Sequence, residues 1–450
     1  MAGALHAPLT RRALLGSAAA AAVAGALGIR PGRAEAMSGL MRIVDLGVGA
    51  TLHPGSANDL RVDDNRALLA ESGTAAVRLW ADWPSLQPSP AFAPDDPANP
   101  GAPYLAALDA QIAAANQDGL RVVLQFYRFP TWANGTEALA AVRGTDAEIL
   151  HAYADRIAPA AWARYVASGR NPAVYSPSRR ALEFSIPAEG CGPGTAWARM
   201  FAWLHERYRP DRPSGLRVDA MELINEANYQ LWPQRAPSTT ADEFGLGPVT
   251  VQRTVAQMMA SARAVSAAAG RPGVILVPSL ADSDQAGRTV TPYDQFTVAL
   301  LDELARTGAV VGRNEIWSHH NYTDVEGRVE ATKTQRLRTL LRGRWTGLAD
   351  PTGPVVLLTE GGARLSRMRA LYPTEDPRAA QATSMALALQ RHARNSGIGA
   401  GVWMFAQYTI HADPAFDSGL LEPWPSTVRR PAFAVWSAGP RGRGPALPIR

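Results

Sequence analysis

Cysteine is almost absent from the sequence, whose 450 residues include only Cys191. One cysteine cannot form an internal disulfide bond, so the fold has to be held together by its hydrophobic core. A chain of this length with 46% hydrophobic residues can bury a core of sufficient size. Because Cys191 lies in the glycine-rich run EGCGPG, we interpret it as an idle thiol and not as a nucleophile.

A long apolar segment is lacking at the N-terminus, where the apolar run covers only residues 13–28. It is shorter than the about 20 residues that span a membrane comfortably. Arg11 and Arg12 precede this run, and residues 34–36 offer a small-residue cleavage site, a pattern typical of bacterial twin-arginine export signals. We therefore predict that residues 1–36 are a leader that is removed, which makes the mature protein periplasmic or extracellular. A retained N-terminal anchor is the alternative.

Clusters of basic residues are lacking as well. The predicted leader carries four Arg and one Glu, so its removal lowers the formal net charge from +5 to +2. Nearly all remaining positive charge is Arg that is scattered along the chain. Because nucleic-acid binding depends on basic residues gathered on one surface, we predict no nucleic-acid partner.

Short β-type runs alternate with longer helical runs along the mature chain. The predicted strands cover residues 42–50, 75–80, 121–127, 219–225, 273–278, 315–320, 355–360 and 401–406. The predicted helices cover residues 60–72, 103–117, 195–209, 250–269, 293–306, 329–343, 377–396 and 431–438. Several of the strands are continuous apolar runs, as is typical of parallel strands that are covered on both faces.

Eight strands that are each followed by a helix predict a single α/β domain, a (β/α)8 TIM barrel, over residues 37–438. A doubly wound sheet has a phosphate-binding G-x-G-x-x-G turn after its first strand, and GVGATLHPG does not match that pattern. Residues 130–194 are too many for an ordinary loop, so we predict a helical insertion after the third strand. Residues 439–450 are predicted to be a flexible tail.

Two of the predicted strands end in glutamate. Asn225-Glu226 follows the apolar run MELI, and Glu360 ends the run VVLLTE. In a (β/α)8 barrel the active site lies at the C-terminal ends of the strands, so these two carboxylates are expected to face each other. A second Asn-Glu pair, Asn314-Glu315, begins a strand and would lie at the opposite end of the barrel, where it serves as an internal control.

Polar and aromatic residues are predicted near the same ends of other strands. They are His53, Arg78, Trp132, Asn134, His320, Tyr322, Trp403, Gln407 and His411. Aromatic faces can stack on a sugar ring while polar groups bind its hydroxyls, so this set predicts a carbohydrate site.

The Asn225-Glu226 pair, Glu360, the His-x-Tyr run at 320–322 and Trp403 together resemble clan A of the glycoside hydrolases. The resemblance covers residues 42 to about 438 and is nearest to the cellulase-like family 5, with some similarity to family 39 in the run FPTWANG. One departure is Ala227, which stands where the family commonly has proline.

The resemblance implies a retaining enzyme that cleaves O-glycosidic bonds, expected to be of the β type, in a poly- or oligosaccharide, and the predicted leader implies that this enzyme is secreted. Glu226 would be the general acid/base, and Glu360 would be the nucleophile. No cofactor and no metal are implied. The sugar, the linkage and the choice between internal and terminal cleavage stay open.

The resemblance also implies roles for neighbouring residues. Arg78 and Tyr322 would hydrogen-bond to Glu360, Asn225 would bind the sugar 2-hydroxyl, and Trp403 would form the floor of a sugar subsite. His53, Trp132 and His320 are further predicted substrate contacts, whereas Glu222 is predicted to be a buried structural partner of an arginine.

Three other functions remain open from the sequence. A transglycosylase would use the same two acids, and a non-catalytic sugar-binding barrel would use neither as a catalyst. A metal-dependent hydrolase would draw its ligands from His53, His319, His320 or His411. Adjacent residues of a strand point to opposite faces, so His319 and His320 make a poor ligand pair.

Overall fold

The computed structural model describes the barrel and most of its connections. The described residues are 40–53, 55–135, 183–184, 186–187, 189–209, 215–229, 231, 251–270, 274–277, 279–283, 290–309, 311–312, 314–328, 332–350, 353–395, 401–413 and 416–439. The predicted leader, most of the predicted insertion and nearly all of the predicted tail lie outside these residues. Within them, no helix combines the length and the apolar character that a bilayer-spanning helix needs.

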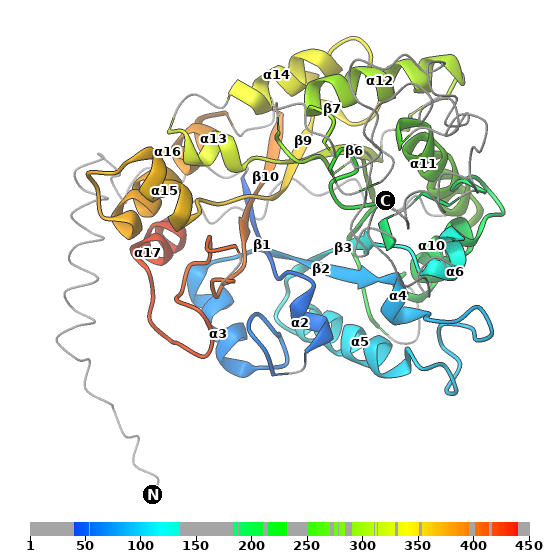
Figure 1. Cartoon of the computed structure of the whole chain (residues 1–450), viewed down its shortest axis with the longest axis horizontal. Helices are drawn as coiled ribbons and strands as arrows, with labels where there is room; N and C mark the ends of the chain where they lie inside the picture. The colour runs from blue at the N-terminus through cyan, green and yellow to red at the C-terminus, as the bar shows by residue number, and fades with distance from the viewer. Residues whose placement is uncertain are drawn as a thin grey trace, which may run out of the picture.

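Eight parallel strands close into a barrel, which confirms the predicted fold (Figure 1). They are β1 (Met41–Asp45), β2 (Ala76–Asp82), β3 (Arg121–Tyr127), β4 (Ala220–Glu222), β5 (Val274–Leu276), β6 (Glu315–His320), β9 (Val356–Glu360) and β10 (Val402–Tyr408). Each strand pairs with the next of these along the chain, and β10 pairs with β1. The remaining two strands, β7 (Ala349–Asp350) and β8 (Gly353–Pro354), form a separate hairpin.

Long helices surround the barrel at the predicted places. They are α3 (Asp63–Ser72), α5 (Ala102–Gln117), α10 (Ala196–Arg207), α11 (Val251–Ala268), α12 (Tyr293–Arg306), α14 (Thr332–Leu341), α16 (Pro377–Asn395) and α17 (Pro431–Ala438). Short helices follow five of the strands directly: α2 (Gly49–Leu52), α4 (Trp83–Leu86), α6 (Thr131–Asn134), α13 (Tyr322–Glu326) and α15 (Leu365–Leu371). The short helices were not predicted, because one or two turns are too few to give a helical period in the sequence.

The side chains inside the barrel change from apolar to polar along the strands. Its N-terminal half holds an apolar cluster that includes Ile43, Ala76, Val123, Ala220, Ile316 and Leu357. Alternate residues of a strand point to the same face, so the next inward positions lie two residues further on. Those positions are Asp45, Arg78, Gln125, Glu222, Ser318 and Thr359, and all six are fully buried. A buried polar layer therefore lies on the apolar cluster, towards the C-terminal ends of the strands.

Several strand boundaries differ from the prediction. Strand β2 ends at Asp82 instead of residue 80, β4 ends at Glu222 instead of residue 225, and β5 ends at Leu276 instead of residue 278. Strand β1 ends at Asp45 and not at residue 50, because the chain turns at Gly47 with a φ of 68° and begins α2 two residues later. Strand β10 continues to Tyr408, two residues beyond its predicted end. The differences in β1 and β10 change which side chains reach the C-terminal end of the barrel.

Gly361 allows the segment after β9 to pack closely. A Cβ atom at this position would lie 2.2 Å from Asn321 Oδ1 and 3.2 Å from the carbonyl oxygen of Ala406. We predict that Gly361→Ala lowers the free energy of unfolding by about 1–3 kcal/mol, because the buried neighbours have to move. Urea denaturation measures this. Gly192→Ala is the matched control, since nothing lies within 4 Å of its Cβ position, and equal losses in both variants would contradict the packing argument.

Candidate active site

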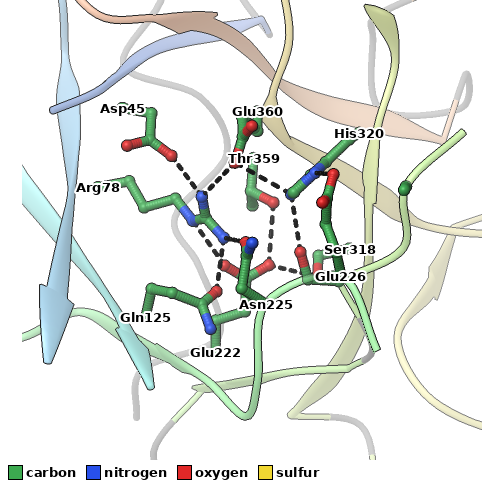
Figure 2. A network of polar contacts seen from close by, with 12 residues as sticks. Asp45, Arg78, Gln125, Glu222, Asn225, Glu226, Ser318, His320, Thr359 and Glu360 are labelled. Carbon is green, nitrogen blue, oxygen red and sulfur yellow. Dashed lines mark hydrogen bonds and ion pairs between the residues drawn. The ribbon is translucent and has the colours of Figure 1, made fainter. Parts of the chain in front are cut away.

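Arg78 lies at the centre of the buried polar layer (Figure 2). A guanidinium group has five N–H donors, and each of those of Arg78 has an acceptor. Nε donates to Glu222 Oε2 at 2.7 Å, Nη1 to Glu360 Oε2 at 2.9 Å and to Asp45 Oδ2, and Nη2 to Gln125 Oε1 at 2.5 Å and Asn225 Oδ1 at 2.7 Å. One side chain therefore connects β1, β3, β4, β9 and the segment that holds Asn225.

Glu222 is the buried arginine partner that the sequence predicts. Its Oε1 also accepts hydrogen bonds from Ser318 Oγ at 2.6 Å and Thr359 Oγ1 at 2.9 Å. Both carboxylate oxygens are thus occupied inside the barrel, and the side chain is fully buried. This arrangement leaves Glu222 a structural role.

Glu360 ends β9 and is held through both carboxylate oxygens. Tyr322 Oη, from the start of α13, donates to Oε1 at 2.7 Å, while Arg78 Nη1 donates to Oε2. The pairing of β6 with β9 shifts register next to this residue, between His319 and His320. The side chain of Glu360 is 10% exposed, so it lies at the boundary between the polar layer and the open end of the barrel.

Glu226 follows β4 with a backbone φ of 42°, a left-handed conformation that is unfavourable for a residue with a side chain. Its carboxylate is 14% exposed, and its Oε1 lies 2.9 Å from His320 Nδ1. His320 Nε2 in turn lies 2.7 Å from Ser279 Oγ and 3.7 Å from Glu360 Oε2. His320 therefore lies between the two carboxylates and contacts both.

The two glutamates approach each other closely at the mouth of the barrel. A carboxylate oxygen of Glu226, a carboxylate oxygen of Glu360 and a ring nitrogen of His320 lie within 4.8 Å of one another. The sequence predicts that the two carboxylates meet, and the structure brings them together. The internal control, Asn314-Glu315, lies at the opposite end of the barrel, where Glu315 begins β6 and binds Arg263 at 2.6 Å.

The same three groups could in principle ligate a divalent metal, since two carboxylates and an imidazole are common ligands. The fixed positive charge of Arg78, 2.9 Å from Glu360 Oε2, disfavours a second cation there. The other histidines of the metal alternative do not join this group. His319 points out of the barrel against Tyr293 at 5.4 Å between ring centroids, and His411 Nε2 lies 3.0 Å from Asn65 Oδ1.

The environment of His320 favours its charged form. Burial acts to lower the pKa of its imidazole, but the negative charge of Glu360, together with the hydrogen bond and charge of Glu226, outweighs burial and raises the pKa. The adjacent His319 is the opposite case: burial, with the neighbouring charges of His320 and Lys333, lowers its pKa to about 3. The pKa values of two neighbouring histidines of one strand are thus shifted in opposite directions.

Asp45 belongs to the site, although it was not predicted. Its Oδ1 accepts hydrogen bonds from Trp80 Nε1 at 2.8 Å and Gly47 N at 2.7 Å, and its Oδ2 accepts from Arg78. The predicted first strand was five residues too long, which placed Asp45 in mid-strand and away from the strand end. The alternation of Met41, Ile43 and Asp45 was a signal that could have revealed an inward-facing carboxylate.

Aromatic side chains lie near the two carboxylates. Tyr127, the last residue of β3, meets Trp80 of β2 edge to face with centroids 4.5 Å apart. Phe416 contacts both Tyr322 at 4.9 Å and Tyr408 at 5.1 Å. Burial and the nearby charge of Glu360 raise the pKa values of Tyr322 and Tyr408 well above the usual range, so both hydroxyls stay protonated.

The predicted position of Trp403 at the floor of a sugar subsite is wrong. Trp403 lies one residue after the start of β10, next to Met404, which pairs with Met41 at the N-terminal end of β1. Trp403 packs against the apolar cluster in the N-terminal half of the barrel and is therefore remote from Glu226 and Glu360. The aromatic residue of β10 that reaches the C-terminal end is Tyr408, which pairs with Asp45. The error arose because β10 is two residues longer than predicted.

Two other predicted substrate contacts lie apart from the carboxylates. Trp132, in α6, donates from Nε1 to the carbonyl oxygen of Gln87 at 3.0 Å and packs edge-on against Trp83. His53 follows α2, and its backbone N–H bonds to Gly49. In the described part of the chain, no contact joins either side chain to Glu226 or Glu360, so their roles stay predictions.

Comparison with known proteins finds similarity only at the level of structure. No protein-family model and no curated protein matches the sequence. A xylanase from Cellvibrio japonicus in complex with xylopentaose has a TM-score of 0.49 and 10% identity, covering 89% of this chain and 66% of its own. The β-glycosidase BGL167 has a TM-score of 0.48 and 14% identity, covering 90% and 97%. Endo-glycoceramidase II from Rhodococcus sp. has a TM-score of 0.45 and 13% identity, covering 89% and 78%.

These neighbours are glycoside hydrolases. Their names agree with the clan that the sequence motifs resemble. The chain spans slightly less than two thirds of the xylanase. The fold follows from the closed strand order, and the function is argued from the site itself.

The charge of His320 predicts a pH-dependent stability. A histidine whose pKa is raised by folding stabilises the protein fully below its unfolded pKa of 6.5, and this contribution is lost as the pH rises through the folded value. The loss of unfolding free energy in His320→Asn is therefore expected to be larger at about pH 5.5 than at about pH 8.5. Denaturation of wild type and variant at both pH values measures this.

His319→Asn is the matched control from the same strand. Because folding lowers the pKa of His319, its contribution is present above pH 6.5 and is lost as the pH falls, the opposite trend. If both variants follow the same trend, the assigned charge states are wrong.

Proposed function

We propose that the protein is a retaining glycoside hydrolase of the clan A type, acting on O-glycosidic bonds of a poly- or oligosaccharide. Glu226 is the acid/base and Glu360 is the nucleophile. The observation that carries this proposal is the close approach of these two carboxylates, with oxygens within 4.8 Å, at the C-terminal end of a (β/α)8 barrel.

The separation of the carboxylates supports retention over inversion. Retaining enzymes have carboxyl groups about 5–5.5 Å apart, whereas inverting enzymes need about 6.5–9.5 Å to place a water molecule between one acid and the sugar. The closest oxygens of Glu226 and Glu360 leave no such space. Direct attack by one carboxylate is therefore favoured over attack by an interposed water.

In the first step Glu360 attacks the anomeric carbon. A bond forms between that carbon and a carboxylate oxygen, while the bond to the leaving oxygen breaks and Glu226 donates its proton to that oxygen. Arg78 and Tyr322 hold Glu360 in one orientation by donating to its two carboxylate oxygens. The product of this step is a covalent glycosyl ester on Glu360.

In the second step Glu226, now ionised, removes a proton from water. The water oxygen bonds to the anomeric carbon, and Glu360 leaves as a carboxylate, so two inversions give net retention. His320, which contacts Glu226 at 2.9 Å and carries a raised pKa, keeps the Glu226 side chain in place during both steps. Its position between the acids also screens one from the other.

The negative groups of the polar layer suit the transition state of this reaction. An oxocarbenium-like sugar carries developing positive charge, which carboxylates fixed in a buried site stabilise without rearrangement. Asn225 is adjacent to Glu226, and its amide is oriented by Arg78 Nη2 at 2.7 Å. We assign it to the sugar 2-hydroxyl, whose hydrogen bonds strengthen in the transition state.

A panel of aryl α- and β-glycosides and of glucan, mannan and xylan oligomers tests the proposal. Glu226→Ala and Glu360→Ala are expected to lower turnover by a factor of at least about 1,000, the scale seen for loss of a catalytic group. Azide fits the space left by either side chain. It should form a glycosyl azide of retained configuration in Glu226→Ala and of inverted configuration in Glu360→Ala, which assigns the two roles.

Glu315→Gln is the control, because Glu315 belongs to the other Asn-Glu pair and binds Arg263 at the opposite end of the barrel. It should keep the wild-type turnover. Wild-type rates in both alanine variants would refute the two-glutamate mechanism, and binding without turnover in the wild type would favour a sugar-binding barrel. Transfer of the glycosyl group to a hydroxyl of a second sugar, in preference to water, would identify a transglycosylase.

A further inference from the structure

The mechanism above makes no use of Asp45, a fully buried carboxylate that faces the nucleophile. Arg78 Nη1 donates to both Asp45 Oδ2 and Glu360 Oε2. A terminal guanidinium nitrogen has two hydrogens, so this nitrogen is fully occupied by the two carboxylates. If Arg78 Nη1 binds one of these carboxylates more weakly, its hydrogen bond to the other carboxylate becomes stronger.

We propose that Asp45 is a positioning residue for the nucleophile: by sharing Arg78 Nη1 with Glu360, it sets how the guanidinium divides its positive charge between the two carboxylates. The inference rests on the proposed function, in which Glu360 attacks the sugar. Asp45 itself does not touch the reacting atoms. It acts on the reaction through Arg78.

The surroundings of Asp45 are built to keep it in one orientation. Trp80 Nε1 and Gly47 N hold its Oδ1, while Arg78 holds its Oδ2. All three neighbours are donors, so an asparagine here would turn its NH2 group towards at least one of them. A carboxylate, which has two acceptor oxygens and no donor, is therefore the group that satisfies all three neighbours.

The charged and titratable groups around Asp45 come from four elements. They are Arg78 on β2, Glu360 on β9, Tyr408 on β10 and Tyr322 on α13. Burial raises the pKa of Asp45 to about 6, Arg78 opposes that rise and the charge of Glu360 adds to it. Because both carboxylates share one nitrogen of Arg78, the protonation of Asp45 depends on the charge of Glu360.

The arrangement also has a use within the reaction cycle. When Glu360 becomes a neutral glycosyl ester, Arg78 loses one of its three carboxylate partners. Asp45 and Glu222 remain on Nη1 and Nε, so the buried guanidinium still has charged partners. The cation is thereby kept in position to receive the carboxylate that the second step releases.

Asp45→Asn tests the proposal through the pH profile of kcat/KM on the substrate found in the panel. With a neutral partner on Nη1, Arg78 binds Glu360 more strongly, which weakens the nucleophile and holds it ionised to lower pH. We expect the maximum of kcat/KM to fall by about tenfold and the acidic limb to move to lower pH by about half a unit or more. The basic limb, which reports the acid/base, should stay in place.

Trp80→Phe changes Asp45 without replacing it, and serves if Asp45→Asn does not fold. It removes the N–H donor that favours ionised Asp45, so Asp45 is neutral over a wider pH range and the acidic limb should move in the same direction as in Asp45→Asn, to lower pH. Asp59→Asn is the matched control: Asp59 is also fully buried and binds Arg61 and the Gly55 backbone, away from the guanidinium of Arg78. It should alter stability without moving either limb.

An acidic limb that stays at its wild-type position in both Asp45→Asn and Trp80→Phe would overturn the inference. That result would leave the proposed function intact, provided that Glu360→Ala has lost its turnover. If Glu360→Ala retains wild-type turnover, the proposed function fails, and the role given to Asp45 fails with it. A limb that moves equally in Asp59→Asn would show a general effect of stability and would also count against the proposal.

Discussion

The complete use of the five N–H donors of Arg78 is the constraint on which the site depends. A buried cation is stable only when its hydrogen bonds and its charge are satisfied together. Here the partners come from positions up to 282 residues apart in the sequence. The arginine can therefore be buried only in a barrel that has closed in the correct register. Closure of the barrel and alignment of Glu360 with Asn225 are consequences of the same set of bonds.

The layering of the barrel interior explains why the buried polar groups do not destabilise the fold. The apolar cluster below the polar layer fills the N-terminal half with side chains that need no partners. The polar layer lies at one level, to which six of the eight barrel strands each contribute one buried polar side chain. Glu222 illustrates the result, since Arg78, Ser318 and Thr359 together occupy both of its oxygens. Low water access then strengthens these bonds and keeps their geometry fixed.

Much of the fold and part of the site followed from the sequence. Alternating apolar runs and helical segments gave the eight strands, and the position of Glu226 and Glu360 at strand ends brought them together, since strand direction in a parallel barrel is fixed. What failed depended on the exact last residue of a strand. Asp45 was missed and Trp403 misplaced because β1 stops at a left-handed turn and β10 continues past its apolar run. Those limits are set by packing between strands, which a local pattern does not contain.

The left-handed backbone of Glu226 has a consequence for the evolution of the chain. Glycine adopts a φ of 42° without strain, whereas glutamate does not. Replacement by glycine would therefore relax the backbone at the cost of the carboxylate. Selection for stability alone favours losing this side chain, and selection for its chemistry alone retains it. Under the proposed mechanism, position 226 is thus a point of stability–activity trade-off, and its persistence as glutamate would record which of the two pressures has prevailed.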